Sequence, residues 1–180
     1  MDSMDPFKSR DVLAPSASQN HTETPKELTP APYWNGVSFR LQNHLFIVNI
    51  ESISSVFPRA QITPLPGVKS WVQGITHNQG RLLPVIDLKV FLGLPHCFSE
   101  ASSHPILELK HPDISAGLLV DEIYGQQRVE NQSNLKAVPD DLPDSLLPFT
   151  HGCYQQKKQY IVLDIEQLAT SEYFLAAAVE

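Results

Sequence analysis

Residues 64–93 read PLPGVKSWVQGITHNQGRLLPVIDLKVFLG, and this stretch decides most of the fold. Apolar residues from Val72 to Ile75 lead into the turn tripeptide Asn78-Gln79-Gly80, in which Asn and Gly adopt positive φ at little cost. The apolar, β-branched run from Leu82 to Ile86 follows directly. The two runs and the turn between them therefore predict a β-hairpin.

Helix signals follow this hairpin. Asp87 ends the second strand, and its side chain can accept hydrogen bonds from the free N–H groups that begin a helix over Leu88–Leu92. Gly93 is the residue type that typically ends such a helix. The segment contains no recognisable arrangement of catalytic residues, so it is interpreted as a structural scaffold.

The same stretch resembles the signature of the CheW-like family, the small adaptor domains that couple bacterial chemoreceptors to the histidine kinase CheA. In that family a Gly, an aliphatic residue and a short polar stretch precede Asn-x-Arg-Gly, an aliphatic pair and Pro-Val-x-Asp-Leu. Residues 74–88 read GITHNQGRLLPVIDL, with Gln79 in place of the family's Arg. Flanking features extend the resemblance from about Gly36 to about Phe174.

The resemblance implies a mainly β fold, CheW-like, with two interlocked five-stranded β-barrels and a few short helices. It implies a non-catalytic adaptor without cofactor or metal, whose partners are a CheA-type histidine kinase and the tip of a methyl-accepting chemoreceptor. The implied receptor-binding residues are Ile53, Val56, Gln79 and Arg81, and the implied kinase-binding residues are Val72, Gly74 and Ile75.

The process served is also suggested by resemblance. The segments LPGVKSWVQG and FTHGCY are most similar to CheW-like adaptors of type IV pilus chemosensory systems, which control twitching motility. The alternative is a coupling protein of an ordinary flagellar chemotaxis array. In either case the expected location is the cytoplasm, with recruitment to a membrane-associated receptor array.

Composition narrows the function classes. The chain has 180 residues, of which 42% are hydrophobic, which suits one globular core. Its net charge of −7 argues against nucleic acid as a partner, because no basic patch stands out to neutralise phosphates. No apolar run approaches the length of about 18 residues that spans a membrane. Two cysteines do not suggest a disulfide framework, so the expected compartment is the reducing cytosol.

The chain divides near Trp34. Residues 1–33 are rich in Ser, Thr, Pro and acids, and we expect a disordered tail because such a segment buries too little apolar surface. Residues 34–180 are expected to form the CheW-like domain with two β-barrel subdomains. Apolar and polar residues alternate over 37–41, Gln42-Asn43 makes a turn, and residues 45–50 return as a strand. Ile50, Ile53 and Val56 follow at helical or bent spacing.

The second half repeats this plan. Strands are predicted over 106–109, 117–120, 150–155 and 160–164, a surface connection over 138–148, and a helix over 172–179 capped by Ser171. Asp164 ends an apolar strand as Asp87 does, 77 positions earlier. Either two similar β modules share a core, or two independent strand–turn–helix units happen to look alike.

Several residues are of types that catalyse reactions or bind metals, but simpler roles explain most of them. His96-Cys97 and His151-x-Cys153 contain zinc-ligand residue types, but their spacing is not that of paired structural ligands. The enzyme alternative is a small Cys-dependent hydrolase that uses Cys153 and His151, although no catalytic signature surrounds either cysteine. Asp87 and Asp164 are interpreted as helix caps rather than a catalytic pair, and Asp121-Glu122 as a solvated turn.

Overall fold

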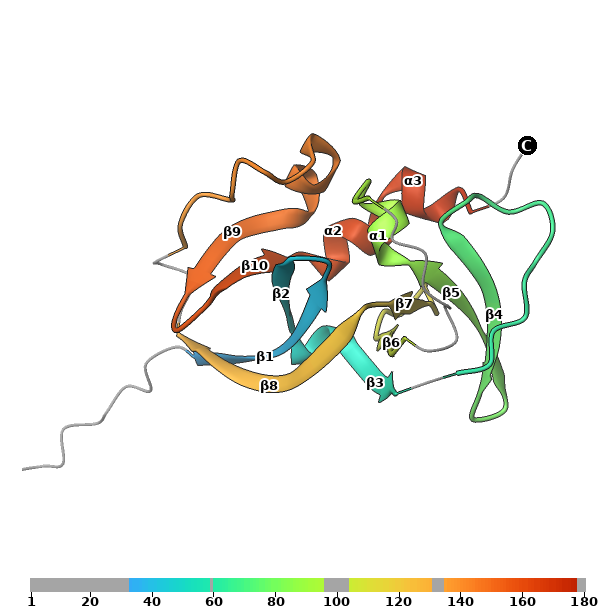
Figure 1. Ribbon diagram of the computed structural model, residues 1–180. Helices are drawn as coiled ribbons and strands as arrows, with labels where there is room; N and C mark the ends of the chain where they lie inside the picture. Colours follow the sequence, from blue (N-terminus) through green and yellow to red (C-terminus); the bar gives the residue numbers. More distant parts are fainter. Residues whose placement is uncertain (1–32, 59, 96–103, 131–134, 178–180) are drawn as a thin grey trace, which may run out of the picture.

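The computed structural model describes residues 33–58, 60–95, 104–130 and 135–177, and these form two five-stranded sheets (Figure 1). The first sheet has the order β8 (Glu122–Glu130), β1 (Tyr33–Leu41), β2 (His44–Asn49), β10 (Gln159–Leu163) and β9 (Thr150–Gln155). The second has the order β3 (Ile53–Phe57), β6 (Ile106–Leu109), β7 (Gly117–Leu119), β5 (Arg81–Asp87) and β4 (Val72–Asn78). The short helices are η1 (Ile50–Ser52), α1 (Leu88–Phe91), η4 (Asp144–Phe149), α2 (Ile165–Thr170) and α3 (Glu172–Leu175).

The two sheets have the same topology. If each strand of the first half, β1 to β5, is matched with the strand five places later, the order of one sheet becomes the order of the other. Each sheet also contains one parallel pair, β2 with β10 and β7 with β5. Both sheets take strands from both halves of the chain, and this supports two similar modules that share a core rather than two independent units.

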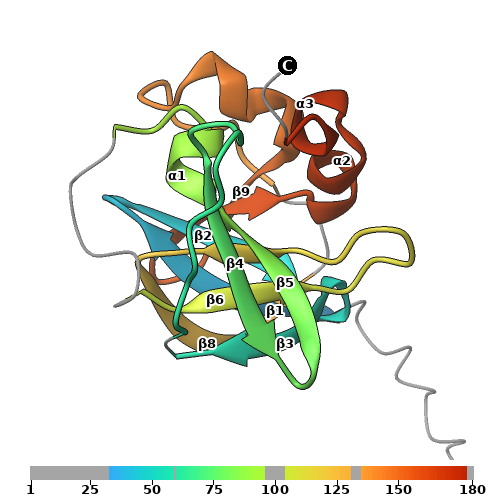
Figure 2. The same cartoon turned by 90° about the vertical axis from the view of Figure 1, so that its right-hand side faces the viewer.

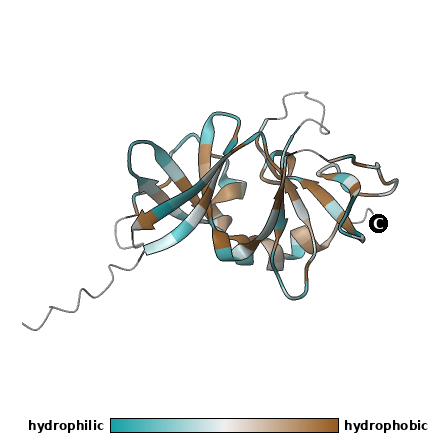
Figure 3. Ribbon diagram, turned by 90° about the horizontal axis from the view of Figure 1, so that it is seen from below, coloured by the Kyte–Doolittle hydropathy of each residue, from teal (hydrophilic) through white to brown (hydrophobic). Residues whose placement is uncertain are grey.

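Among the described residues, three apolar clusters pack the sheets and helices together. The largest contains residues from both sheets and from the helices, including Phe39, Trp71 and Leu107, and forms the shared core. Each sheet also surrounds a small cluster of its own. In the first sheet this cluster joins Val129 of β8 to Tyr154 of β9, so the sheet curls until its two edge strands meet the same apolar interior. Figure 3 shows apolar and polar segments alternating along the strands of both sheets.

The predicted hairpins are confirmed, with one correction at the decisive turn. Asn78 pairs with Arg81, so the turn consists of Gln79 and Gly80 alone, with φ of 46° and 82°. Positive φ at both central residues is the requirement of a type I′ turn, the two-residue turn whose twist matches that of the flanking strands. The left-handed residue before Gly80 is therefore Gln79 rather than Asn78, and Gln42 in the β1–β2 turn has a similar φ of 53°.

Other predictions need correction where distant parts of the chain supply the partner. Residues 122–130, for which no strand was predicted, form β8 along β1, and residues 53–57 form a strand rather than a bent or helical segment. The connection over 138–148 is not wholly at the surface, because Leu142 and Leu146 belong to the shared core. The predicted helix over 172–179 begins as expected but ends at Leu175. Of the expected tail, residues 1–33, all but Tyr33 lie outside the described residues, and Tyr33 is the first residue of β1.

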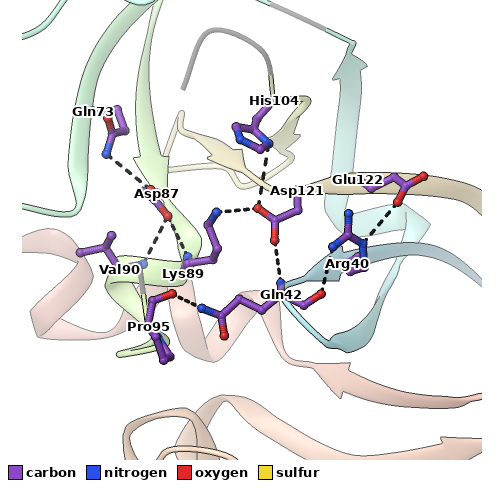
Figure 4. Close-up of polar contacts among 10 residues, drawn as sticks. All are labelled: Arg40, Gln42, Gln73, Asp87, Lys89, Val90, Pro95, His104, Asp121 and Glu122. Carbon is purple, nitrogen blue, oxygen red and sulfur yellow. Dashed lines mark hydrogen bonds and ion pairs between the residues drawn. The ribbon is translucent and has the colours of Figure 1, made fainter. Parts of the chain in front are cut away.

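A buried ion pair links the two sheets (Figure 4). Asp121, just before β8, lies 2.5 Å from Lys89 Nζ of α1, and its second oxygen accepts a hydrogen bond from the backbone N–H of Gln42 at 2.6 Å. His104 Nδ1 lies 3.9 Å from the same carboxylate. The prediction that Asp121 lies in a solvated turn is therefore wrong. Asp121 connects the helix that follows β5 of the second sheet to the β1–β2 turn of the first.

Candidate docking surface

An open pocket lies beside β4, one edge strand of the second sheet. Its volume is about 510 Å³, and it is lined by Phe57, Ala60, Gln61, Thr63, Ile75, Thr76, His77, Asn78 and Leu82. The segment before β4 forms one wall, because Thr63 and Ile75 exchange backbone hydrogen bonds of 2.8 and 2.9 Å. Leu82 is 64% exposed, and Val56 of β3 is 44% exposed, so apolar side chains face solvent here.

Gly74 makes the close approach of this wall possible. It has a φ of 141°, and a Cβ atom added there would lie 2.1 Å from the backbone oxygen of Thr63. Of the residues predicted to bind the kinase, Ile75 lines the pocket and Val72 packs partly against the shared core. Gly74 is buried, so the structure gives it a role inside the fold that is independent of any partner.

The tip of the β4–β5 hairpin and β3 lie at the same end of the molecule (Figure 2), and Glu108 links the two segments through side chains. The carboxylate of Glu108 accepts a hydrogen bond from Asn78 Nδ2 at 3.0 Å and a short one from Ser55 Oγ. Its other oxygen lies 3.7 Å from Arg81 Nη2. We call Ser55, Asn78, Arg81 and Glu108 the Glu108 cluster.

The residues predicted to bind the receptor fall on both sides of this cluster. Ile53 and Val56 lie on β3, but Ile53 is only 9% exposed and belongs to the shared core, whereas Val56 faces solvent. Gln79 is exposed in the turn, and Arg81, whose side chain is 73% exposed, begins β5. Val56, Gln79 and Arg81 are therefore exposed on the second sheet, and Arg81 is also part of the Glu108 cluster.

Sequence reasoning missed Glu108. Its signal is a charged residue inside the apolar run Ile106–Leu109, a strand that is buried along its whole length. Charged side chains are seldom fully buried unless they are paired. A buried acid in such a strand therefore points to partners brought from elsewhere in the chain, although sequence alone does not name them.

The geometry does not favour the catalytic alternative. Cys153 is completely buried, and burial raises the pKa of its thiol, which is the opposite of what an activated thiolate needs. His151 Nε2 lies 2.7 Å from the Asp164 carboxylate, and that carboxylate also caps α2. The side chain of Asp87 caps α1 in the same way.

In the described parts of the chain, no group of three or more His, Cys, Asp or Glu residues is placed to hold a metal ion. His96 and Cys97 lie outside the described residues. Over the same ranges, no helix has the length and apolar character needed to cross a membrane.

Comparison with known proteins agrees with these observations. Residues 35–173 match the family model described as the CheW-like domain. The chain is 34% identical over 146 residues to Protein PilI of Pseudomonas aeruginosa, which covers 81% of each chain. It is 31% identical over 105 residues to the chemotaxis protein CheW of Thermotoga maritima, covering 58% of this chain and 68% of the relative.

A solved structure shares the fold. The scaffolding protein TtCheW from Thermoanaerobacter tengcongensis superimposes with a TM-score of 0.65 at 22% identity, covering 79% of this chain and 96% of TtCheW. The family model spans most of the chain, and the PilI relative is similar over most of both proteins. This protein therefore belongs to the CheW-like domain family of non-catalytic scaffold proteins.

Proposed function

We propose that this protein is a cytoplasmic adaptor that couples chemoreceptors to a CheA-type histidine kinase, in an array that controls twitching motility by type IV pili. The similarity to PilI over 81% of both chains carries the assignment to the pilus system. An adaptor must offer docking surfaces rather than a reaction site. The second sheet offers an open pocket and exposed apolar side chains at its edges. Partner proteins commonly pair with an exposed edge strand or occupy an apolar groove beside it.

The kinase is proposed to dock at the pocket beside β4. Ile75 supplies part of the pocket lining, and Val72 anchors the same strand by packing against the shared core. Gly74 has no side chain, so the backbone of Thr63 can approach β4 closely and form one wall of the pocket. Leu82 is the most exposed large apolar residue described, and it lines the same pocket. Burial of such a side chain at an interface contributes about 1.5–3 kcal/mol.

The receptor tip is proposed to dock at Val56, Gln79 and Arg81, which do not line the pocket beside β4. Val56 offers the apolar contact, Gln79 and Arg81 offer polar contacts, and Ile53 holds β3 against the core beneath them. Gln79 carries no charge, so apolar contacts are proposed to dominate, with Arg81 supplying the charge that the family places at position 79.

Direct binding measurements test both assignments. The full chain is titrated by calorimetry with the CheA-type kinase and with a receptor cytoplasmic fragment from the same genome. Leu82→Glu is expected to weaken kinase binding by at least about tenfold, because it places a charge in the pocket. Leu175→Glu is the matched control, since Leu175 is 58% exposed on α3, outside the pocket.

The outcomes separate the candidate functions. Kinase binding that Leu82→Glu leaves unchanged would place the kinase elsewhere, and an absence of binding to both partners would overturn the adaptor assignment. The similarity to proteins named CheW favours the flagellar array as the second candidate. Deletion of the gene is expected to abolish twitching and leave swimming intact, and the reverse result would favour that candidate.

A further inference from the structure

Glu108 is an unusual residue for its position. Its side chain is 7% exposed, and it lies in a strand whose other residues are all apolar and buried. Removing a carboxylate from water is costly unless hydrogen bonds and opposite charges compensate. In this protein the compensation comes from three different strands, through Ser55 of β3, Asn78 of β4 and Arg81 of β5.

These partners join the two edges of the second sheet. The strand order places β3 at one edge and β4 at the other, and their backbones are not paired with each other in that order. Ser55 is the cross-strand neighbour of Glu108, and the Asn78–Arg81 pair flanks the Gln79-Gly80 turn. A single carboxylate thus holds the hairpin tip against the opposite edge strand through side chains alone.

We propose that Glu108 is a positioning residue for receptor docking: it fixes the β4–β5 tip, which carries Gln79 and Arg81, relative to β3, which carries Val56. This inference rests on the receptor site proposed above. The guanidinium of Arg81 remains available to a partner, because the side chain is 73% exposed.

The first sheet supplies a matched control. There Gln127 donates to Ser38 Oγ at 2.9 Å and to Tyr160 OH at 3.0 Å, linking edge strand β8 to β1 and β10. Removing this side chain also breaks a partly buried polar link in a curled sheet. It does so away from the β4–β5 tip, so Gln127→Ala measures the effect of a general loss of stability.

The tip is examined first in the free protein. Glu108→Gln keeps the shape and an acceptor oxygen but removes the charge, and Glu108→Ala removes the whole group. Amide hydrogen exchange at Asn78 and Arg81 is expected to accelerate at least about tenfold in Glu108→Ala. Gln127→Ala is measured at the same interval below its own thermal midpoint, and the acceleration in Glu108→Ala should exceed any change seen there. Equal exchange at these amides in the two variants would overturn the positioning role, whether or not a receptor binds.

Receptor binding is then measured with the receptor cytoplasmic fragment as a double-mutant cycle. Glu108→Gln is expected to weaken binding about tenfold in the natural chain and by less than about twofold when Arg81 is already Ala, because the contact that it positions is gone. Equal losses in both backgrounds would show a purely structural role. If the natural chain does not bind the fragment, the proposed receptor site fails, and the exchange measurement still decides whether Glu108 positions the tip.

Discussion

Asp87 and Asp164 occupy the same position in the two halves of the chain. Each carboxylate accepts hydrogen bonds from the first turn of the helix that follows, α1 or α2. Each backbone N–H donates a 2.8 Å hydrogen bond to the residue just before the hairpin, which is Trp71 in the first half and Phe149 in the second. The internal resemblance seen in the sequence is therefore an equivalence of hydrogen bonds and not only of apolar pattern.

The equivalence extends to the strand before each aspartate. Gly152 has a φ of 122°, and a Cβ atom there would lie 2.8 Å from the backbone oxygen of Lys136, much as Gly74 faces Thr63. Next to each glycine an isolated bridge joins the preceding segment to the strand, Thr63 with Ile75 and Lys136 with Cys153. The same backbone device thus appears in both sheets.

Gly74→Ala is expected to destabilise the protein by more than about 3 kcal/mol, because backbone strain adds to a collision with the Thr63 carbonyl. Gly80→Ala is the control, since Gly80 also has positive φ but no heavy atom within 4 Å of an added Cβ. It should lose only about 1–2 kcal/mol. Urea unfolding measures both, and equal losses would refute the steric explanation. Kinase binding by a Gly74 variant must therefore be compared at conditions where the variant is still folded, because unfolding alone would weaken the apparent binding.

Lys89→Met is expected to cost about 3 kcal/mol of unfolding free energy, because it leaves the Asp121 carboxylate buried without its main positive partner. Glu122→Gln removes the charge of an ion pair with Arg40 in which both side chains are well exposed, and it leaves the hydrogen bond from Arg40 to the Gln42 carbonyl in place, so it serves as the control and should cost less than about 1 kcal/mol. Chemical denaturation at neutral pH compares them. Similar losses would show that the Lys89–Asp121 pair does not carry the link between the sheets.

Stability should also depend on acid through Asp121. Burial opposes ionisation of this carboxylate, but hydrogen bonds from Lys89 and Gln42 and the nearby positive charge outweigh it, so its pKa lies below the ordinary value of 3.8. A lowered pKa stabilises the folded state above pH 3.8, and that stability is lost as the pH falls through the lowered value. The stability difference between the natural chain and Asp121→Asn should therefore be full at pH 6 and smaller at pH 3. A difference that does not change with pH would contradict this.

Gln79→Ala is expected to weaken receptor binding by less than about 1 kcal/mol, the scale of one neutral hydrogen bond, with little dependence on salt. Arg81→Ala should cost more, and its effect should shrink at high salt because the contact involves a charge. Arg128→Ala is the control for net charge, since Arg128 lies over the Tyr33 ring in the first sheet. Titration at two salt concentrations tests this. A large loss for Gln79→Ala with no effect of Arg81→Ala would restore position 79 as the polar anchor.

A chain that begins at Tyr33, the first residue of β1, is expected to keep its thermal midpoint within a few degrees. The preceding residues show no apolar pattern that could add to the core. Scanning calorimetry of the full and shortened chains tests this. Loss of a cooperative transition in the shortened chain would show that the first 32 residues contribute to the folded state.

Local signals explain what the sequence predicts well. Turn residues and apolar alternation place the hairpins, and Asp87, Asp164 and Ser171 mark helix starts that the structure confirms. Strand β8 was missed because its residues are mostly polar, and it becomes a strand through pairing with β1, far away in the sequence. Glu108 and Asp121 were missed or misinterpreted for the same reason. Their partners are set by topology, which a local pattern does not contain.

Because each sheet takes strands from both halves of the chain, the topology also sets the order in which the strands of each sheet become available during synthesis. All five strands of the second sheet lie between Ile53 and Leu119, so a ribosome delivers them as one continuous block. The first sheet is split, because its β1–β2 hairpin emerges first and then waits for β8, β9 and β10. Until residue 163 has been made, that hairpin has unpaired edges of the kind that favour misassembly. All strands of the second sheet are therefore synthesised before the first sheet can be completed. A truncated chain that ends before β8 has its β1–β2 hairpin without either of the strands that flank it in the folded sheet.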